Sequence, residues 1–213
     1  MQNNFNHITP IYDFLAGLIF GKSIKESQIW LLPFIPENAN MLIIGGGTGW
    51  ILEEILATNF KCRIVYLEAS KKMLKQSQKR YQKHAKKSNI LIEFRLGTEI
   101  DLKETESFDV IFTGFLLDLF LEENLRKLMQ KLYKHLKPGE LWLIADFQPK
   151  NATRFWQKSL LQTMISFFKI TANLQANQLP DLDSAFSGFQ LKPEHQKLFY
   201  HKLIQSSVYR KQV

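Results

Sequence analysis

The residues best suited to chemistry lie in two short stretches, a glycine-rich turn and an acid that closes a strand. The turn lies in NMLIIGGGTGW (40–50), where an apolar run leads into Gly45, Gly47 and Gly49. Glycines between a strand and a helix indicate a tight turn whose main chain comes close to another group. The acid is Glu68, at the end of the next apolar run. A carboxylate at that point is suited to accept the hydroxyls of a ribose.

Short apolar runs alternate with stretches of helical periodicity from residue 40 onward. The pattern predicts strands over 40–45, 61–68, 89–96, 107–114 and 140–147, and helices over 49–58, 70–86 and 122–136. Alternation with short connections predicts a parallel sheet with helices on both faces. In such a sheet ligands bind beyond the carboxyl ends of the strands, which is where the glycine turn and Glu68 lie.

Both ends of the chain depart from this alternation. Residues 5–34 read as two helices, and residues 151–173 as an apolar helix rich in aromatic side chains. The segment 195–211 reads as two strands joined by a tight turn, which should pair antiparallel. We therefore expect one domain with three parts: an N-terminal helical cap (1–38), a ligand-binding core (39–147) and a C-terminal part with the aromatic helix and the hairpin (148–213).

The composition indicates a compact protein with few constraints on its partners. The 213 residues are 45% hydrophobic and include one cysteine, Cys62, so a disulfide within the chain is excluded and a reducing, cytoplasmic setting is expected. Cys62 reads as a buried thiol, with a nucleophile as the alternative. The apolar run 14–20 is too short for a transmembrane segment. The net charge of +8 permits an anionic partner, such as RNA, an acidic lipid surface or a phosphorylated substrate.

Four segments, in the right order, resemble the motifs of the class I S-adenosylmethionine-dependent methyltransferases. These are MLIIGGGTGW for the first motif, VYLEASKKML for the second-strand acid and the helix after it, SFDVIFTG for the fourth strand and LYKHLKPGELWLIADF for the fifth. The resemblance covers about residues 40–211. It implies a doubly wound, Rossmann-like, mostly parallel seven-stranded sheet in the order 3-2-1-4-5-7-6, with S-adenosyl-L-methionine as cofactor and no metal.

The same resemblance implies a role for each residue near the ligand. Gly45, Gly47 and Gly49 would wrap the methionine part of the cofactor, and Glu68 would hold the ribose. The other implied contacts are Ala69, Ser70 and Met73 beside the sugar and adenine, Thr98 and Glu99 at the adenine edge, and Thr113, Gly114 and Phe115 facing the methionine part and the methyl group. Each is also compatible with plain architecture, Met73 above all.

Two positions depart from the family pattern and keep a non-catalytic, cofactor-binding role open. Ile43 stands where the first motif often carries an acid, and Thr98 where an acid often follows the third strand. An NAD-dependent oxidoreductase is disfavoured, because Trp50 replaces the last glycine of the dinucleotide motif.

Catalytic residues are less well defined, because methyl transfer requires a base only when the acceptor must lose a proton. Residues 5–28 resemble the N-terminal segment of the ubiquinone/menaquinone-biosynthesis type of methyltransferase. On it, Tyr12 could reach the cofactor carboxylate or the acceptor, or merely pack at a helix boundary. Asp118 is a candidate base, with helix capping as the alternative.

The acceptor is suggested by two helices. The aromatic helix over 151–173 would suit a small, apolar or quinone-like acceptor, with core packing as the alternative. Residues 71–87 hold eight Lys or Arg and no acid, which is typical of a solvated helix face but allows RNA or protein methylation, or contact with an anionic membrane surface. RNA is disfavoured, because no aromatic-rich nucleic-acid module accompanies the charge.

Overall fold

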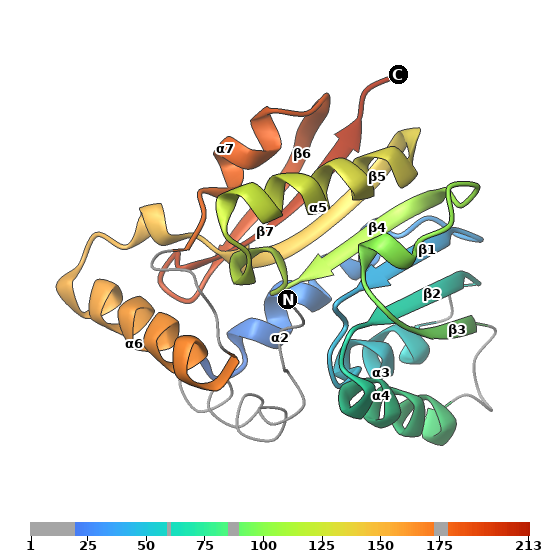
Figure 1. The fold of residues 1–213 in the computed structure, drawn as a ribbon, viewed down its shortest axis with the longest axis horizontal. Helices are drawn as coiled ribbons and strands as arrows, with labels where there is room; N and C mark the ends of the chain where they lie inside the picture. The colour runs from blue at the N-terminus through green and yellow to red at the C-terminus, as the bar shows by residue number, and fades with distance from the viewer. Residues whose placement is uncertain (1–19, 59–60, 85–89, 173–178) are drawn as a thin grey trace.

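The computed structural model describes residues 20–58, 61–84, 90–172 and 179–213, and these form one seven-stranded sheet with helices on both faces (Figure 1). The strands are β1 (Asn40–Ile44), β2 (Arg63–Glu68), β3 (Leu91–Leu96), β4 (Phe108–Gly114), β5 (Leu136–Phe147), β6 (Leu191–Phe199) and β7 (Ile204–Lys211). Their order is β3-β2-β1-β4-β5-β7-β6. Neighbours among β1 to β5 pair parallel, whereas β7 pairs antiparallel to β5 and β6. The predicted sheet, its order and its C-terminal hairpin are confirmed.

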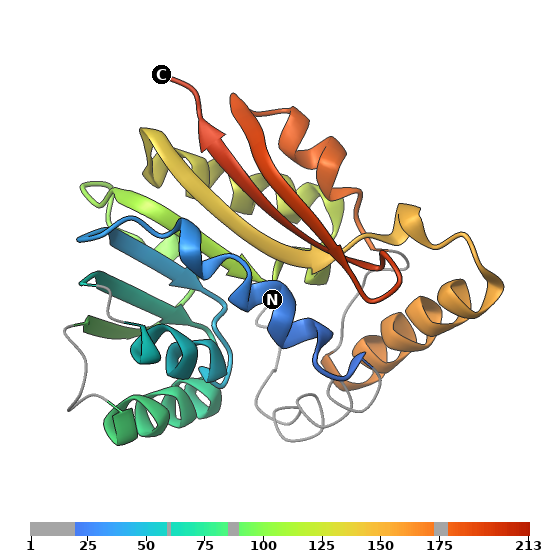
Figure 2. The ribbon, with the colours of Figure 1, turned by 180° about the vertical axis from the view of Figure 1, so that it is seen from behind.

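The helices connect the strands as the alternating pattern predicts. They are α2 (Ser23–Ile29), α3 (Trp50–Ala57), α4 (Lys71–His84), α5 (Glu122–His135), α6 (Phe155–Ala172) and α7 (Leu182–Ser187), with short 3-10 turns η2 (Leu32–Phe34), η4 (Glu99–Asp101), η5 (Leu117–Leu119) and η6 (Pro149–Asn151). Helix α2 crosses the face of the sheet on which α3 and α4 lie (Figure 2). Helices α5 and α7 lie on the opposite face (Figure 1).

The core is divided by the sheet, because successive side chains of a strand point to opposite faces. In β1, Ile43 packs in the cluster that contains α3, whereas Leu42 and Ile44 pack in the cluster that contains α5. All three are at most 4% exposed, as expected for a strand covered on both faces. Ile43, at the position where the motif that this segment resembles often has an acid, is therefore a core residue.

Two predicted boundaries need correction. Helix α5 ends at His135, and β5 begins at Leu136 rather than at residue 140. Leu136 pairs with Phe108, and the register resumes only at Val110 and Leu141, so Lys137 to Glu140 bulge out of the pairing. The segment Lys137-Pro138-Gly139 follows the end of helix α5, as predicted, but it already belongs to strand β5.

Helix α7 was not predicted, because six residues are too few to show helical periodicity. It begins after Asp181, whose carboxylate accepts a hydrogen bond from Ser184 N at 3.2 Å, a local capping signal that the sequence does carry.

Part of the predicted N-terminal cap lies outside the described residues, including Tyr12. The described part of that prediction contains α2 and η2. Helix α6 agrees with the predicted aromatic helix to within four residues. None of the helices in the described ranges combines the length and the apolar character that crossing a membrane requires.

Candidate functional site

The glycine turn between β1 and α3 needs its glycines for two different reasons. Gly45, Gly47 and Gly49 have φ values of +67°, +61° and +79°, in the left-handed region that side chains disfavour. Gly49 also packs tightly, since a Cβ there would lie 2.5 Å from the Cβ of Ser77 on α4. A Cβ on Gly47 would meet no described atom within 4 Å. The turn is closed at its helix end, whereas at Gly47 no described residue occupies the place that a side chain would take.

The carboxylate of Glu68 holds this turn in place. Its Oε2 accepts a hydrogen bond from Gly47 N at 2.9 Å, and its Oε1 accepts one from Ser70 N at 2.7 Å. Burial raises the pKa of Glu68, and the backbone hydrogen bonds from Ser70, Gly47 and Ala69 oppose that rise. A carboxylate can accept about four hydrogen bonds, so capacity for a further donor is left. The two stretches singled out in the sequence thus form one unit.

Tyr66 completes this unit and was missed in the sequence. Its hydroxyl donates to the carbonyl oxygen of Gly47 at 3.0 Å, and its ring is fully buried. Because strand side chains alternate, Tyr66 and Glu68 share one face of β2, and that spacing was the available signal. Both backbone polar atoms of Gly47 are therefore held by β2.

The residues that follow Glu68 have separate environments. Ala69 is exposed, Ser70 is buried and Met73 is half-buried in the first turn of α4. The hydroxyl of Ser70 accepts a hydrogen bond from Met73 N at 3.3 Å, so it caps the start of α4. Ala69 and Met73 follow Glu68 in the chain, and neither places an atom within 4 Å of a Cβ on Gly47.

At the end of β3, where the sequence predicted contacts from Thr98 and Glu99, the carboxylate of Asp101 also lies close to the strand end. Thr98 begins η4 in a capping box with Asp101, whose Oδ2 accepts a hydrogen bond from Thr98 N at 2.8 Å. Asp101 Oδ2 would lie 2.5 Å from a Cβ placed on Gly97. Glu99 is half-buried at the first position of the same turn. The capping box thus brings the carboxylate of Asp101 close to Thr98, the position at which the acid is absent.

The end of β4 divides between the two faces of the sheet. The hydroxyl of Thr113 accepts a hydrogen bond from Trp142 Nε1 at 3.0 Å, within the cluster beneath α5. The side chain of Thr113 therefore does not join the glycine turn. Gly114 lies against α2, since a Cβ there would come within 2.8 Å of Gln28 Oε1.

The next two residues turn the chain back toward β1. Phe115 has φ +52°, a strained value for a bulky residue, and its ring packs against Phe147 at 5.2 Å between centroids. Leu116 lies over Gly45, because a Cβ on that glycine would be 2.6 Å from Leu116 Cδ1. Leu116 thus walls the β4 side of the glycine turn.

The candidate base Asp118 is buried, with an exposed fraction of 2%. Its carboxyl is hydrogen-bonded to that of Asp146 at the end of β5, and burial raises its pKa to about 7. The pKa of Asp146 is also raised, first by burial and then by the neighbouring Asp118. Asp146, not Asp118, accepts the hydrogen bonds of the η5 amides.

Cys62 is buried, as the sequence predicted. Burial raises the pKa of its thiol to about 11, so it is protonated at neutral pH and a poor nucleophile.

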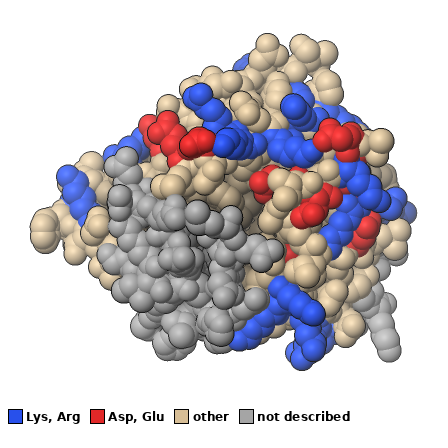
Figure 3. Space-filling model, viewed as in Figure 1, with Lys and Arg blue, Asp and Glu red and all other residues tan. Residues whose placement is uncertain are grey.

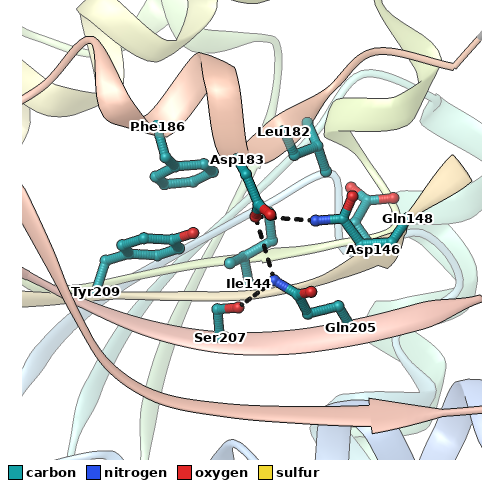
Figure 4. A pocket seen from close by; sticks show the side chains of 9 residues that line it. All are labelled: Ile144, Asp146, Gln148, Leu182, Asp183, Phe186, Gln205, Ser207 and Tyr209. Atoms are coloured by element: carbon teal, nitrogen blue, oxygen red, sulfur yellow. Dashed lines mark hydrogen bonds between the residues drawn. The ribbon is translucent and has the colours of Figure 1, made fainter. Parts of the chain in front are cut away.

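A separate polar cluster lies between α7 and the strands β5 and β7 (Figure 4). Asp183 Oδ1 accepts hydrogen bonds from Gln148 Nε2 at 3.0 Å and from Gln205 Nε2 at 3.3 Å, and Asp183 is also ion-paired with Lys150. The cavity among these side chains holds about one water molecule. It is too small for a substrate.

Charged side chains gather at two other places. The exposed Lys71, Lys75, Lys79 and Lys83 follow one row of α4, and blue side chains mark that helix at the lower edge of the molecule (Figure 3). A hollow of about 360 Å³ lies at the amino ends of the strands, lined by Arg63, Arg95, Glu106 and Lys137 among others. Because ligands in open α/β sheets bind at the carboxyl ends, this hollow is not the predicted site.

Comparisons with known proteins agree with this geometry. Residues 42–139 match the family model described as a methyltransferase domain. The search among curated protein sequences gives no match. This part of the chain is thus similar to a methyltransferase domain, and the sheet has the order of the Rossmann-like methyltransferase fold that the sequence motifs predicted.

Solved structures show the same fold over nearly the whole chain. The CcbJ methyltransferase from Streptomyces caelestis has a TM-score of 0.70 at 13% identity, with 100% of each chain covered. The N-methyltransferase NodS from Bradyrhizobium japonicum WM9, in complex with S-adenosyl-L-homocysteine, has a TM-score of 0.63 at 13% identity, covering 88% of this chain and 85% of that one. The cyclopropane synthase MmaA2 from Mycobacterium tuberculosis has a TM-score of 0.68 at 13% identity, covering 88% and 84%.

Proposed function

We propose that the protein transfers the methyl group of S-adenosyl-L-methionine to a small, apolar or quinone-like acceptor in the cytoplasm. The observation that carries the proposal is the Glu68 carboxylate, which is buried, anchored to Gly47 N and Ser70 N, and able to accept further hydrogen bonds. Among the described residues nothing fills the place beside Gly47, which supports the approach of a ligand to the turn on that side. The bound cofactor supplies an activated methyl group on sulfur, and the protein supplies position and exclusion of water.

The residues around the turn have distinct roles in this proposal. Glu68 accepts the two ribose hydroxyls, as a carboxylate at the end of the second strand does in dinucleotide sites. The bare main chain of Gly45, Gly47 and Gly49 lies along the methionine part. Tyr66 acts indirectly, by fixing the carbonyl of Gly47.

The flanking strands supply the remaining contacts. Ala69 and Met73 border the sugar and the adenine, and Asp101 joins Thr98 and Glu99 at the adenine edge. On the β4 side, Gly114 and the backbone of Phe115 face the methyl group. Thr113 contributes only its backbone, because Trp142 already donates to its hydroxyl.

The acceptor side is apolar and lacks negative charge. From residue 147 to residue 180 the sequence has no acid, and α6 buries Leu161 and Ile165 in the core. These two side chains pack in the core, so the proposal of an uncharged acceptor rests on the absence of acids from this segment. Asp118 is fully buried, so the proposed reaction does not use it as a base on the acceptor.

Calorimetry with S-adenosyl-L-homocysteine, the demethylated product, tests the proposal. We expect binding of this product and none of NADH. Glu68→Gln should weaken binding at least tenfold, because a hydrogen bond to a charged acceptor contributes about 1.5–3 kcal/mol. Glu54→Gln on α3 is the matched control and should leave the affinity unchanged. NADH binding, or equal affinities for Glu68→Gln and the control, would refute the assignment.

The lysine row of α4 favours a second candidate, methylation of an anionic acceptor such as RNA. With Lys72 beside this row, α4 exposes five lysines and contains no acid. Transfer of a labelled methyl group to RNA would fall steeply with salt, whereas transfer to a quinone or phenol would not. Binding of the product with no transfer to quinones, phenols, lipids, protein or RNA would indicate a non-catalytic protein.

A further inference from the structure

The strand β3 is an outer edge of the sheet, because among the described strands it pairs with β2 alone (Figure 1). Leu91 N donates a hydrogen bond to Cys62 O at 3.1 Å. Gly97 N donates one to Glu68 O at 3.0 Å. The odd-numbered residues of β3 therefore direct their main-chain polar groups toward β2. The N–H and carbonyl groups of the even-numbered residues point outward, and these residues are Ile92, Phe94 and Leu96.

The opposite edge of the sheet, β6, is guarded against pairing with another strand. It contains Pro193, which has no N–H, and a register shift between Pro193 and His195. It also exposes Lys192 and Lys197. Proline, bulges and edge lysines are devices that keep strand edges from pairing. Strand β3 contains no proline, no lysine and no register shift, so its edge lacks these devices.

The side chains of β3 are complementary to a second copy of the same strand that runs in the opposite direction. Glu93 and Arg95 lie on one face, where Arg95 Nε donates to Glu93 Oε1 at 2.7 Å. An antiparallel pair centred on Phe94 brings the outward main-chain groups of both copies together and places Glu93 of each copy opposite Arg95 of the other. A pair centred on Glu93 or on Arg95 places like charges opposite each other, which is destabilising.

The register centred on Phe94 also covers apolar side chains that β3 leaves exposed. Leu96 is 53% exposed and would lie opposite Ile92 of the other copy, and Leu91 is 70% exposed at the end of the paired segment. Phe94 packs against Tyr81 of α4, with 5.6 Å between ring centroids, and would meet its own copy on the two-fold axis. The apolar layer between β3 and α4 would then continue from one copy into the other.

We propose that two copies of the chain associate through β3, antiparallel and centred on Phe94, so that their sheets join across a two-fold axis. The interface is isologous, because each copy contributes the same strand. Main-chain hydrogen bonds hold the two edges together, and the pairs of Glu93 with Arg95 fix the register. No ligand takes part in this pairing, so the inference does not rest on the proposed function.

Sedimentation equilibrium over a range of protein concentrations tests the association, at about 0.3 M salt to screen the net charge of +8 on each copy. The mass should rise from 25.0 kDa toward twice that value. Glu93→Lys places a lysine opposite Arg95 of the other copy and should weaken the association at least tenfold. The matched control Glu123→Lys, which also removes an ion-paired glutamate, should leave it unchanged. A mass of 25.0 kDa at every concentration, or equal association of both variants, would overturn the proposal.

Disulfide formation between single-cysteine substitutions tests the register. Directly opposite residues of this pair have Cα atoms about 4.5 Å apart, within the range of a disulfide. A mixture of Glu93→Cys with Arg95→Cys should therefore form a cross-linked dimer on mild oxidation, whereas neither variant alone should. A mixture of Glu123→Cys with Arg95→Cys is the control and should not cross-link. Cross-linking of Glu93→Cys alone, or none in the first mixture, would overturn the register.

The two proposals can fail independently. A protein that binds S-adenosyl-L-homocysteine and remains a monomer would refute the pairing of β3 and leave the proposed function standing. A dimer with the expected cross-link that does not bind this product would refute the proposed function and leave the interface standing.

Discussion

Replacing Asp118 by Asn should stabilise the folded protein, although Asp118 is buried and hydrogen-bonded. Burial in the wild type raises the pKa of Asp118 to about 7, from about 3.9 in the unfolded chain. Between these two pH values, Asp118 therefore keeps its proton in the folded state and has lost it in the unfolded state. The contribution of Asp118 to stability is fully present below about pH 3.9 and is lost as the pH rises to about 7.

The magnitude follows from the two pKa values. One pKa unit corresponds to about 1.4 kcal/mol, so the wild type loses about 4 kcal/mol through Asp118 between about pH 3.9 and 7. About 3 kcal/mol of this loss falls between pH 5 and pH 8. Asn has no proton to lose and still donates to Asp146, so Asp118→Asn avoids this loss.

Urea unfolding at pH 5 and at pH 8 measures the effect. The difference in unfolding free energy between Asp118→Asn and the wild type should increase by about 3 kcal/mol from the lower to the higher pH. Asp118→Ala is the control for packing: it loses stability at both pH values but should share the altered pH dependence. Parallel stability curves for the wild type and Asp118→Asn would refute the account of the buried pair.

Three further predictions concern the turn and the core. Tyr66→Phe leaves the carbonyl of Gly47 without its buried donor and should cost about 1–3 kcal/mol in urea unfolding; a cost below 0.3 kcal/mol would mean that another group replaces the hydroxyl. Gly49→Ala should destabilise the fold by more than Gly47→Ala. Both variants pay the strain of the left-handed backbone, about 1–2 kcal/mol, but only the Cβ at position 49 also collides with Ser77. Equal urea midpoints for the two variants would contradict this packing. Cys62 should resist a thiol reagent at pH 8 in the native protein and react once urea unfolds it, since burial raises its pKa to about 11; fast native labelling would contradict its burial.

Much of the fold could be predicted because the central strands are covered on both faces. β1 and β2 are short, continuous apolar runs, and each is followed by a helix with a clear start. The antiparallel tail was predictable because no helix fits between its strands. The bulge over Lys137 to Glu140 was not, since a helix stop and a strand start overlap there and only pairing with β4 distinguishes them. Helix α7 was missed because six residues carry no periodic signal.

The candidate site was predictable only where its contacts are local in the chain or carried by a motif. The glycine turn and Glu68 were found, but Asp101 was not, because a capping box brings it back to Thr98 in space. The pair of Asp118 and Asp146 depends on β4 and β5 being neighbours, and their separation along the chain gives no sign of it.

The main alternative to a ligand role for Glu68 is that it merely braces the turn. The structure supports part of this view, since both carboxylate oxygens already accept backbone hydrogen bonds. A brace alone, however, gives no reason why no described residue fills the place beside Gly47, or why the carboxylate keeps unused acceptor capacity. The two roles separate by measurement: a brace predicts that Glu68→Gln loses stability and product affinity together, in the same ratio as Tyr66→Phe. A ribose contact predicts an affinity loss for Glu68→Gln well beyond that ratio, because Glu68, unlike Tyr66, touches the ligand.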